Sequence, residues 1–153
     1  MTHKFNNFMS FALNEAKKAG SAGEIPVGAV IMKEGKLLAT GQNRTRRDND
    51  PTAHAEIVAI REASSRLKNF RLDDCDLFVT LEPCAMCAGA IVEARIKRLY
   101  FGADDSKSGA TFHGAKVFAH PQCHHKPEIY QGIDAETSQF LLRSFFDEQR
   151  KSK

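Results

Sequence analysis

The apolar residues near the start of the chain recur three or four positions apart, a spacing that is typical of one face of an amphipathic helix. Gly20 follows this pattern and supplies a stop signal, because glycine is enriched where helices end. The pattern therefore predicts a helix over residues 1–20. Its apolar positions are Phe5, Phe8, Met9, Ala12, Ala16 and Ala19.

Two short apolar runs come next, at residues 26–32 and 36–41, with Glu34 and Gly35 between them. Short apolar runs joined by a few residues that include glycine are typical of a β-hairpin.

Strong helix formers dominate residues 52–67, which predicts a helix there. Ile57, Ile60 and Leu67 share one side of this helix. Thr52 stands near its start, where a threonine can cap the first turn.

The remaining pattern predicts a buried strand, a helix, a second strand, a long loop, a short strand and a final amphipathic helix. Pro83 suits the first turn of the first of these helices, where its missing N–H costs nothing. The loop is too long for a plain connection, and such loops usually carry function. The strands are expected at residues 77–81, 98–102 and 128–132, and the long loop at residues 103–127. The helices are expected at residues 84–94 and around Leu141, Leu142, Phe145 and Phe146.

This order of elements predicts an α/β fold of three layers, a mixed β-sheet flanked by helices on both faces. The chain of 153 residues has the size of one domain and shows no linker or repeat, so we expect a single domain over residues 1–153. No apolar run approaches the length of a membrane span, and the start lacks the apolar core of a signal peptide. We therefore expect a cytoplasmic protein without a membrane partner.

The net charge of +3 is too small to indicate nucleic-acid binding by itself, so such an argument needs local clusters. Two exist, and an ordinary solvated surface is the simplest interpretation of both. They are Arg44, Arg46 and Arg47, and Arg143, Arg150, Lys151 and Lys153.

The clearest chemical signal combines His54 and Glu56 with the pair Cys84 and Cys87, each group at the start of a predicted helix. Side chains in a first turn point toward the helix N-terminus, so two such ends can converge on one ion. One imidazole and two thiolates are ligands suited to zinc, and three protein ligands leave a fourth position open for water, as in a catalytic site. We expect one Zn²⁺ per chain, with Glu56 as the proton carrier.

A C-x-x-C pair alone also fits a redox dithiol or half of a structural zinc site. A redox dithiol gives no role to an upstream H-x-E, and a four-cysteine site needs a second C-x-x-C that this chain lacks. A zinc-stabilised binding module without activity stays an alternative, although it has no use for an unligated Glu56.

These motifs resemble the signature of the cytidine deaminase superfamily, H-x-E followed by P-C-x-x-C. Further segments are similar to its tRNA-specific adenosine deaminase branch. They are residues 26–30, Asn43 and residues 50–57, 80–91 and 101–110.

The resemblance implies the cytidine deaminase-like fold and a homodimer. It also implies hydrolysis of the wobble adenosine in the anticodon stem-loop of an arginine tRNA to inosine and ammonia, by zinc-bound hydroxide. A small-molecule deaminase of cytosine, cytidine or guanine is the alternative, because it would share every residue of the zinc site.

Carried over to this chain, the resemblance makes His54, Cys84 and Cys87 the zinc ligands and Glu56 the catalytic residue. It implies that Asn43 and the backbone of Ala55 bind the base, and that Asp104, Asp105 and Lys107 lie near the anticodon strand. The basic C-terminal helix is an RNA-contact element in the family. For Asn43 a second interpretation, a turn residue that closes the hairpin, stays open.

Residues 112–129 depart from the family pattern. Cys123, His124 and His125 lie there, and an exposed polar loop with a free thiol is the expected structure, because their spacing is not a regular ligand spacing. Cys75 is likewise expected to be a lone thiol.

Overall fold

The structure is a computed structural model that describes residues 8–151. The elements come in the predicted order, although the first helix ends at Ser21 rather than Gly20, and Phe5 lies outside the described residues. The elements are α1 (Phe8–Ser21), β1 (Gly28–Lys33), β2 (Lys36–Gln42), α2 (Ala55–Leu67), β3 (Cys75–Leu81), α3 (Ala85–Ala94), β4 (Arg98–Ala103), the 3₁₀ turn η1 (Val117–Ala119), β5 (Glu128–Tyr130) and α4 (Ala135–Lys151).

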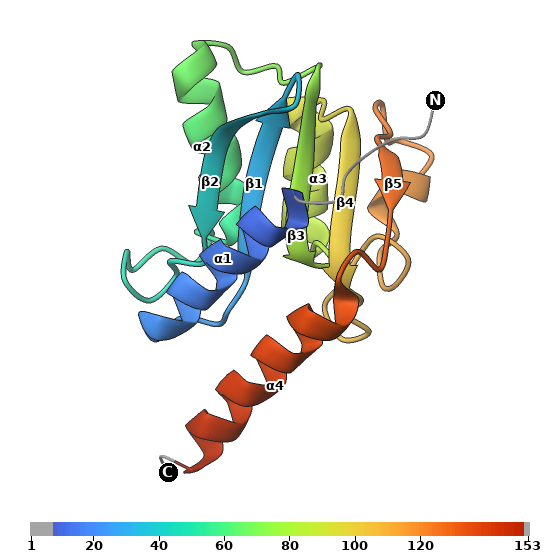
Figure 1. Ribbon diagram of the computed structural model, residues 1–153. Coiled ribbons are helices and arrows are strands. Elements are labelled where there is room, and N and C mark those ends of the chain that lie inside the picture. The colour runs from blue at the N-terminus through green and yellow to red at the C-terminus, as the bar shows by residue number, and fades with distance from the viewer. Residues whose placement is uncertain (1–7, 152–153) are drawn as a thin grey trace.

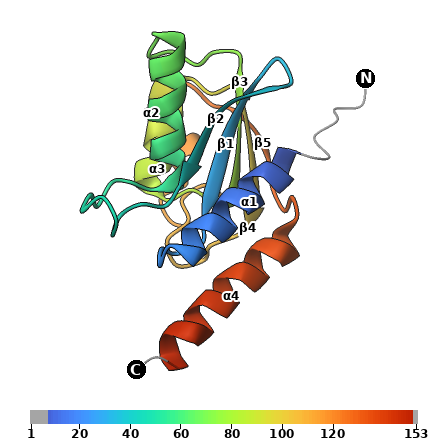
Figure 2. The ribbon, with the colours of Figure 1, turned by 60° about the vertical axis from the view of Figure 1, so that its left-hand side comes forward.

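The five strands form one mixed sheet in the order β2-β1-β3-β4-β5. Strand β1 runs antiparallel to β2 and β3, whereas β3, β4 and β5 are parallel. Helices α2 and α3 cover one face of the sheet, and α1 and α4 lie on the other (Figures 1 and 2). The predicted α/β fold, a mixed sheet with helices on both faces, is confirmed.

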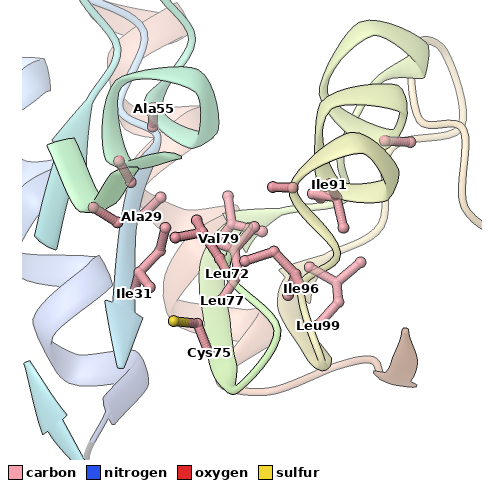
Figure 3. Close-up of a cluster of buried hydrophobic side chains, with 14 of the residues drawn as sticks. Ala29, Ile31, Ala55, Leu72, Cys75, Leu77, Val79, Ile91, Ile96 and Leu99 are labelled. Atoms are coloured by element: carbon pink, nitrogen blue, oxygen red, sulfur yellow. The ribbon is translucent and has the colours of Figure 1, made fainter. Parts of the chain in front are cut away.

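Alternation along β3 divides the core between the two faces, because successive side chains of a strand point in opposite directions. Leu77 and Val79 pack under α2 and α3 with Ile91 of α3 (Figure 3). Phe78 belongs to the cluster under α1, where its ring stacks on that of Tyr100 with the centroids 4.2 Å apart.

Helix α2 packs most closely through its alanines, while Ile60 and Leu67, on the side where the sequence places Ile57 as well, pack against the core as partly buried residues. Ala55, Ala59 and Ala63 are buried, while the three larger residues are only partly buried. The reason is close packing of backbones. A Cβ added at Gly41 of β2 would lie 2.1 Å from the Ala55 carbonyl oxygen, so only small residues fit between the helix and the strand.

Two further predictions about helix starts are wrong. Thr52 does not cap α2, because its hydroxyl donates to Asp50 Oδ1 at 2.7 Å and stabilises the turn before the helix. Pro83 precedes α3 rather than standing in its first turn, since Cys84 is the N-cap residue. His54 holds the same position at the start of α2, and neither cap side chain bonds the helix backbone. Both side chains are thereby left to face outward from a helix N-terminus.

The long loop after β4 folds back on the body of the protein. Cys123 is partly buried against the core and its thiol donates to the His125 carbonyl oxygen at 3.1 Å, while His125 Nε2 lies 2.7 Å from the Ile96 carbonyl oxygen. The expectation of an exposed polar segment is therefore wrong for Cys123 and His125, because packing and hydrogen bonds fix both; His124 is exposed.

The structure also bears on the membrane. Over residues 8–151, no helix is both long and apolar enough to span a bilayer.

Candidate active site

The ends of α2 and α3 bring His54, Cys84 and Cys87 together. His54 Nδ1 lies 3.6 Å from Cys84 Sγ and 3.5 Å from Cys87 Sγ, and the three ligand atoms all lie within 4.8 Å of one another. Bonds of roughly 2.0–2.1 Å to nitrogen and 2.3 Å to sulfur at tetrahedral angles would set these N and S atoms roughly 3.5 Å apart. The spacing and the donor set therefore fit one zinc ion per chain.

The charges within this cluster favour a bound cation. A hydrogen bond from Cys87 and another from His54 lower the pKa of Cys84 to about 4, so its sulfur is a thiolate at neutral pH. The hydrogen bond to Cys84 also raises the pKa of the Cys87 thiol and that of His54. The thiolate therefore already attracts positive charge, and the partial positive charge of the two helix N-termini adds to its stability.

Glu56 lies in the first turn of α2 and is 4% exposed. Burial and the nearby Cys84 thiolate raise the pKa of Glu56 to about 7. A carboxyl group with a pKa near neutrality can both accept and donate a proton during a reaction. Glu56 supplies no ligand atom to the three-residue cluster, so its carboxyl group could move protons without giving up a metal ligand.

A cavity of about 140 Å³ opens beside the cluster. A cavity of about 150 Å³ can hold a benzene ring, so the space suits a planar ring more than a whole nucleotide. Its walls combine apolar side chains with a few polar groups, as small-molecule sites usually do. The lining residues are Ile25, Val27, Asn43, His54, Ala55, Glu56, Leu81, Glu82, Cys84, Asp105 and Ser108.

Asn43 follows β2 and lines this cavity, whereas the turn of the hairpin lies at Glu34 and Gly35. Its Nδ2 donates to the Ile25 carbonyl oxygen at 3.4 Å. Its Oδ1 is buried and accepts no hydrogen bond from any described residue, which is costly unless a ligand supplies the donor. The structure thus places Asn43 away from the hairpin turn, and its binding role stays a prediction.

Buried charge holds the segment after Asn43 in place. Glu24 is buried and accepts hydrogen bonds from the backbone amides of Arg46 and Arg47, and from Arg47 Nε at 3.1 Å. Arg47 Nη2 also donates to the Asn43 carbonyl oxygen at 2.7 Å. Arg47 is an exposed residue, as expected of the first arginine cluster, and its hydrogen bonds also fix the position of the Asn43 backbone.

Of the three residues predicted near the anticodon strand, only one lines the cavity in the structure. Asp105 reaches the cavity, while Asp104 and Lys107 are exposed and do not line it. Asp105 Oδ1 accepts the backbone N–H of Lys107 at 3.1 Å and that of Ser108 at 3.0 Å, so this carboxylate also shapes its own turn.

Glu82 also belongs to the surroundings of the site, although no sequence motif singled it out, and its carboxylate is fully buried beside the cavity. Burial alone would raise its pKa, but hydrogen bonds from the backbone of Asp105 and from His113 outweigh that effect and lower it. The signal was present in the sequence, because a glutamate between an apolar strand and the Pro83-Cys84 pair needs a partner once buried.

The comparisons with known proteins agree with this geometry. Residues 2–103 match the family model described as cytidine and deoxycytidylate deaminase zinc-binding region. The tRNA-specific adenosine deaminase of Agrobacterium fabrum is 51% identical over 144 residues, which cover 94% of this chain and 95% of that protein. The corresponding enzyme of Bacillus subtilis is 39% identical and is matched over 95% of this chain and 91% of its own length.

Solved structures point the same way. One comes from a study of A-to-I editing by tRNA:A34 deaminases at the wobble position of transfer RNA; it has a TM-score of 0.88 and 51% identity, over 89% of this chain and 99% of that chain. A guanine deaminase from Bacillus subtilis has a TM-score of 0.65 and 35% identity, over 95% of each chain. The chain belongs to the cytidine and deoxycytidylate deaminase family, and within it to the tRNA-specific adenosine deaminases.

Proposed function

We propose that this protein hydrolyses the wobble adenosine of a tRNA anticodon loop to inosine and releases ammonia. The observation that carries this proposal is one cavity that joins the zinc-type cluster, the protonatable Glu56 and the unpaired Oδ1 of Asn43. The 51% identity of this chain to a tRNA-specific adenosine deaminase supports this substrate. The resemblance points to an arginine tRNA, and such a substrate would place the enzyme in the cytoplasm.

His54, Cys84 and Cys87 would hold the zinc ion. A zinc ion there would lower the pKa of a water molecule and so supply a nucleophile at neutral pH. Glu56 would take a proton from the attacking water and give it to N1 of the adenine as the water oxygen bonds to C6. Glu56 would then take the proton of the new C6 hydroxyl group and give it to the amino group, so that the C6–N bond breaks, the C6 carbonyl of inosine forms and ammonia leaves.

The other walls of the cavity would hold the base. The Asn43 amide can accept and donate hydrogen bonds at a purine edge, and the Ala55 backbone lies beside it in the cavity lining. A base in a loop is already partly unstacked, so its extrusion into such a cavity costs little. Asp105 in the cavity wall, with Asp104 and Lys107 next to it, would contact the flanking strand.

The C-terminal helix suits the rest of the stem-loop. Figures 1 and 2 show that α4 extends past the sheet, and its last turn carries the exposed cations Arg150 and Lys151. Cations on a projecting helix can reach phosphates away from the catalytic cavity, which would fix the orientation of the stem-loop without reading its sequence.

Inosine formation in an anticodon stem-loop is the expected activity, with little turnover of free adenosine, cytidine or guanine. The reason is that a folded loop contacts both the cavity and the surface around it, whereas a free nucleoside contacts only the cavity. Ammonia release and nucleoside analysis measure both reactions, and a stem-loop with guanosine at the wobble position is the matched control.

Faster turnover of a free base than of the stem-loop would contradict the proposal. In that case the small-molecule alternative, which the similarity to a guanine deaminase supports, would replace it.

We also propose that the protein forms a homodimer through α3. The outer side of this helix is apolar and small, with Met86 exposed and open space around Gly89. An uncovered apolar helix face of this kind suits a second copy of the same chain.

Sedimentation should therefore give twice the mass of the chain. Gly89→Lys should give a folded monomer, because a Cβ atom added at Gly89 would have no neighbour within 4 Å among residues 8–151, whereas the lysine would enter the interface. A monomeric parent protein, or a Gly89→Lys variant that stays dimeric, would contradict this arrangement.

A further inference from the structure

Glu82 lies between β3 and Cys84, where the chain leaves the sheet for the cluster. Its backbone N–H donates to the Ala103 carbonyl oxygen at 2.8 Å, which ties this position to the end of β4. Its side chain is 0% exposed. A buried carboxylate needs several donors, so the groups around it reveal its role.

Among residues 8–151, four donors surround the Glu82 carboxylate, and all four come from residues 105–113. The backbone N–H of Asp105 and His113 Nδ1 lie at Oε1, at 3.0 and 2.8 Å. The backbone amides of Thr111 and Phe112 donate to Oε2, both at 3.1 Å. An ionised carboxylate offers about four acceptor positions, so these contacts use its whole capacity. Glu82 therefore joins the start of this segment to its end.

The segment that Glu82 closes forms one wall of the cavity, through Asp105 and Ser108. Gly109 pairs with Cys84 in an isolated antiparallel β-bridge. The Ala110 N–H donates to the Pro83 carbonyl oxygen at 2.9 Å. A Cβ added at Gly109 would lie 2.5 Å from the Glu82 Cδ atom, so the loop runs directly over the carboxylate. The position of this wall relative to Cys84 thus depends on Glu82.

We propose that Glu82 is a positioning residue, whose carboxylate holds residues 105–113 against the site so that their cavity wall meets the substrate. It has no acceptor capacity left for substrate or proton, so it acts through the loop rather than on the reacting atoms. The proposal rests on the proposed function for the identity of the substrate, but the state of the loop can be measured without any substrate.

Glu82→Gln is the direct test, because the amide keeps the shape but turns one acceptor oxygen into a donor that opposes the loop amides. Hydrogen exchange at Asp105, Thr111 and Phe112 should quicken in the free protein, with zinc content and circular dichroism unchanged. KM for the stem-loop should rise about tenfold or more, with kcat changed much less, because the displaced wall weakens substrate contact. Glu62→Gln, on the outer side of α2, is the matched control and should leave every value unchanged.

Gly109→Ala displaces the same loop while leaving the carboxylate intact, and it should reproduce the rise in KM if Glu82→Gln does not fold. His113→Ala removes one donor of the four and should have a small effect.

The outcomes separate the possible roles. A fall in kcat with unchanged KM and unchanged loop exchange would overturn the proposal in favour of a direct role in proton transfer. Loss of zinc or fold in both Glu82→Gln and Gly109→Ala would overturn it in favour of a purely structural role. Inactivity of the parent protein on the stem-loop would instead refute the proposed substrate, while loop exchange would still report on Glu82.

Discussion

Glu56→Gln should lower kcat on the stem-loop by about 10²- to 10⁴-fold, the usual contribution of a positioned proton carrier, while zinc content stays the same. The amide fills the same buried space but cannot take a proton from water or deliver one to the base. Glu56 is also outside the three-residue cluster, so its replacement removes no zinc donor. Single-turnover assays with parallel metal analysis measure both quantities.

The position of Glu56 makes this loss specific. Its carboxyl group is buried, and its pKa of about 7 reflects burial and the Cys84 thiolate next to it. Glu62→Gln makes the same chemical change at a partly exposed position of α2 that does not line the cavity, and this variant should keep full activity. Near-normal turnover by Glu56→Gln would refute the catalytic role.

The sequence could indicate that His54, Cys84 and Cys87 lie together, because they belong to two helix starts. His54 and Glu56 belong to one first turn, and Cys84 and Cys87 to another. Side chains at such positions have few directions in which to point, so short motifs carry most of the geometry. The cluster of His54 with both cysteines follows from these two turns once the sheet brings them together.

The sequence did not predict the contacts that hold the walls of the site in place, because these contacts join residues far apart in the chain. Glu24 binds the backbone of Arg47, and Glu82 binds the backbone of Asp105, each across 23 positions of the chain. A short sequence pattern says nothing about such a partner. The same limit applies to Asn43. The sequence alone does not show that this residue bonds Ile25 and lines the cavity rather than closing the hairpin turn.

Packing also explains a feature of α2 that the sequence did not show. Its alanines are buried more deeply than Ile57 and Ile60, because the close approach of Gly41 to Ala55 requires small residues there. The single domain over residues 1–153 and the roles of the individual site residues stay predictions. Variants of the site residues test their roles directly.

Cys87→Ser should reduce bound zinc from about one ion per chain to a small fraction of that, and activity should fall in proportion. A serine hydroxyl is a harder donor and stays protonated at neutral pH, so the cluster would lose a soft anionic ligand. Thermal stability should fall as well, because an ion that binds only the folded state stabilises it, and Cys87 is completely buried. Metal analysis, activity and thermal unfolding of one preparation measure these effects together.

Cys123→Ser is the matched control, since it makes the same chemical change at a partly buried cysteine in the long loop and should keep zinc and activity. Removal of zinc from the parent protein with a chelator should give the same inactive state as Cys87→Ser, and added zinc should restore only the parent. Full activity in metal-free protein would refute the zinc site. The spectrum of an iron-sulfur cluster would refute it as well, because the two thiolates would then serve a different metal.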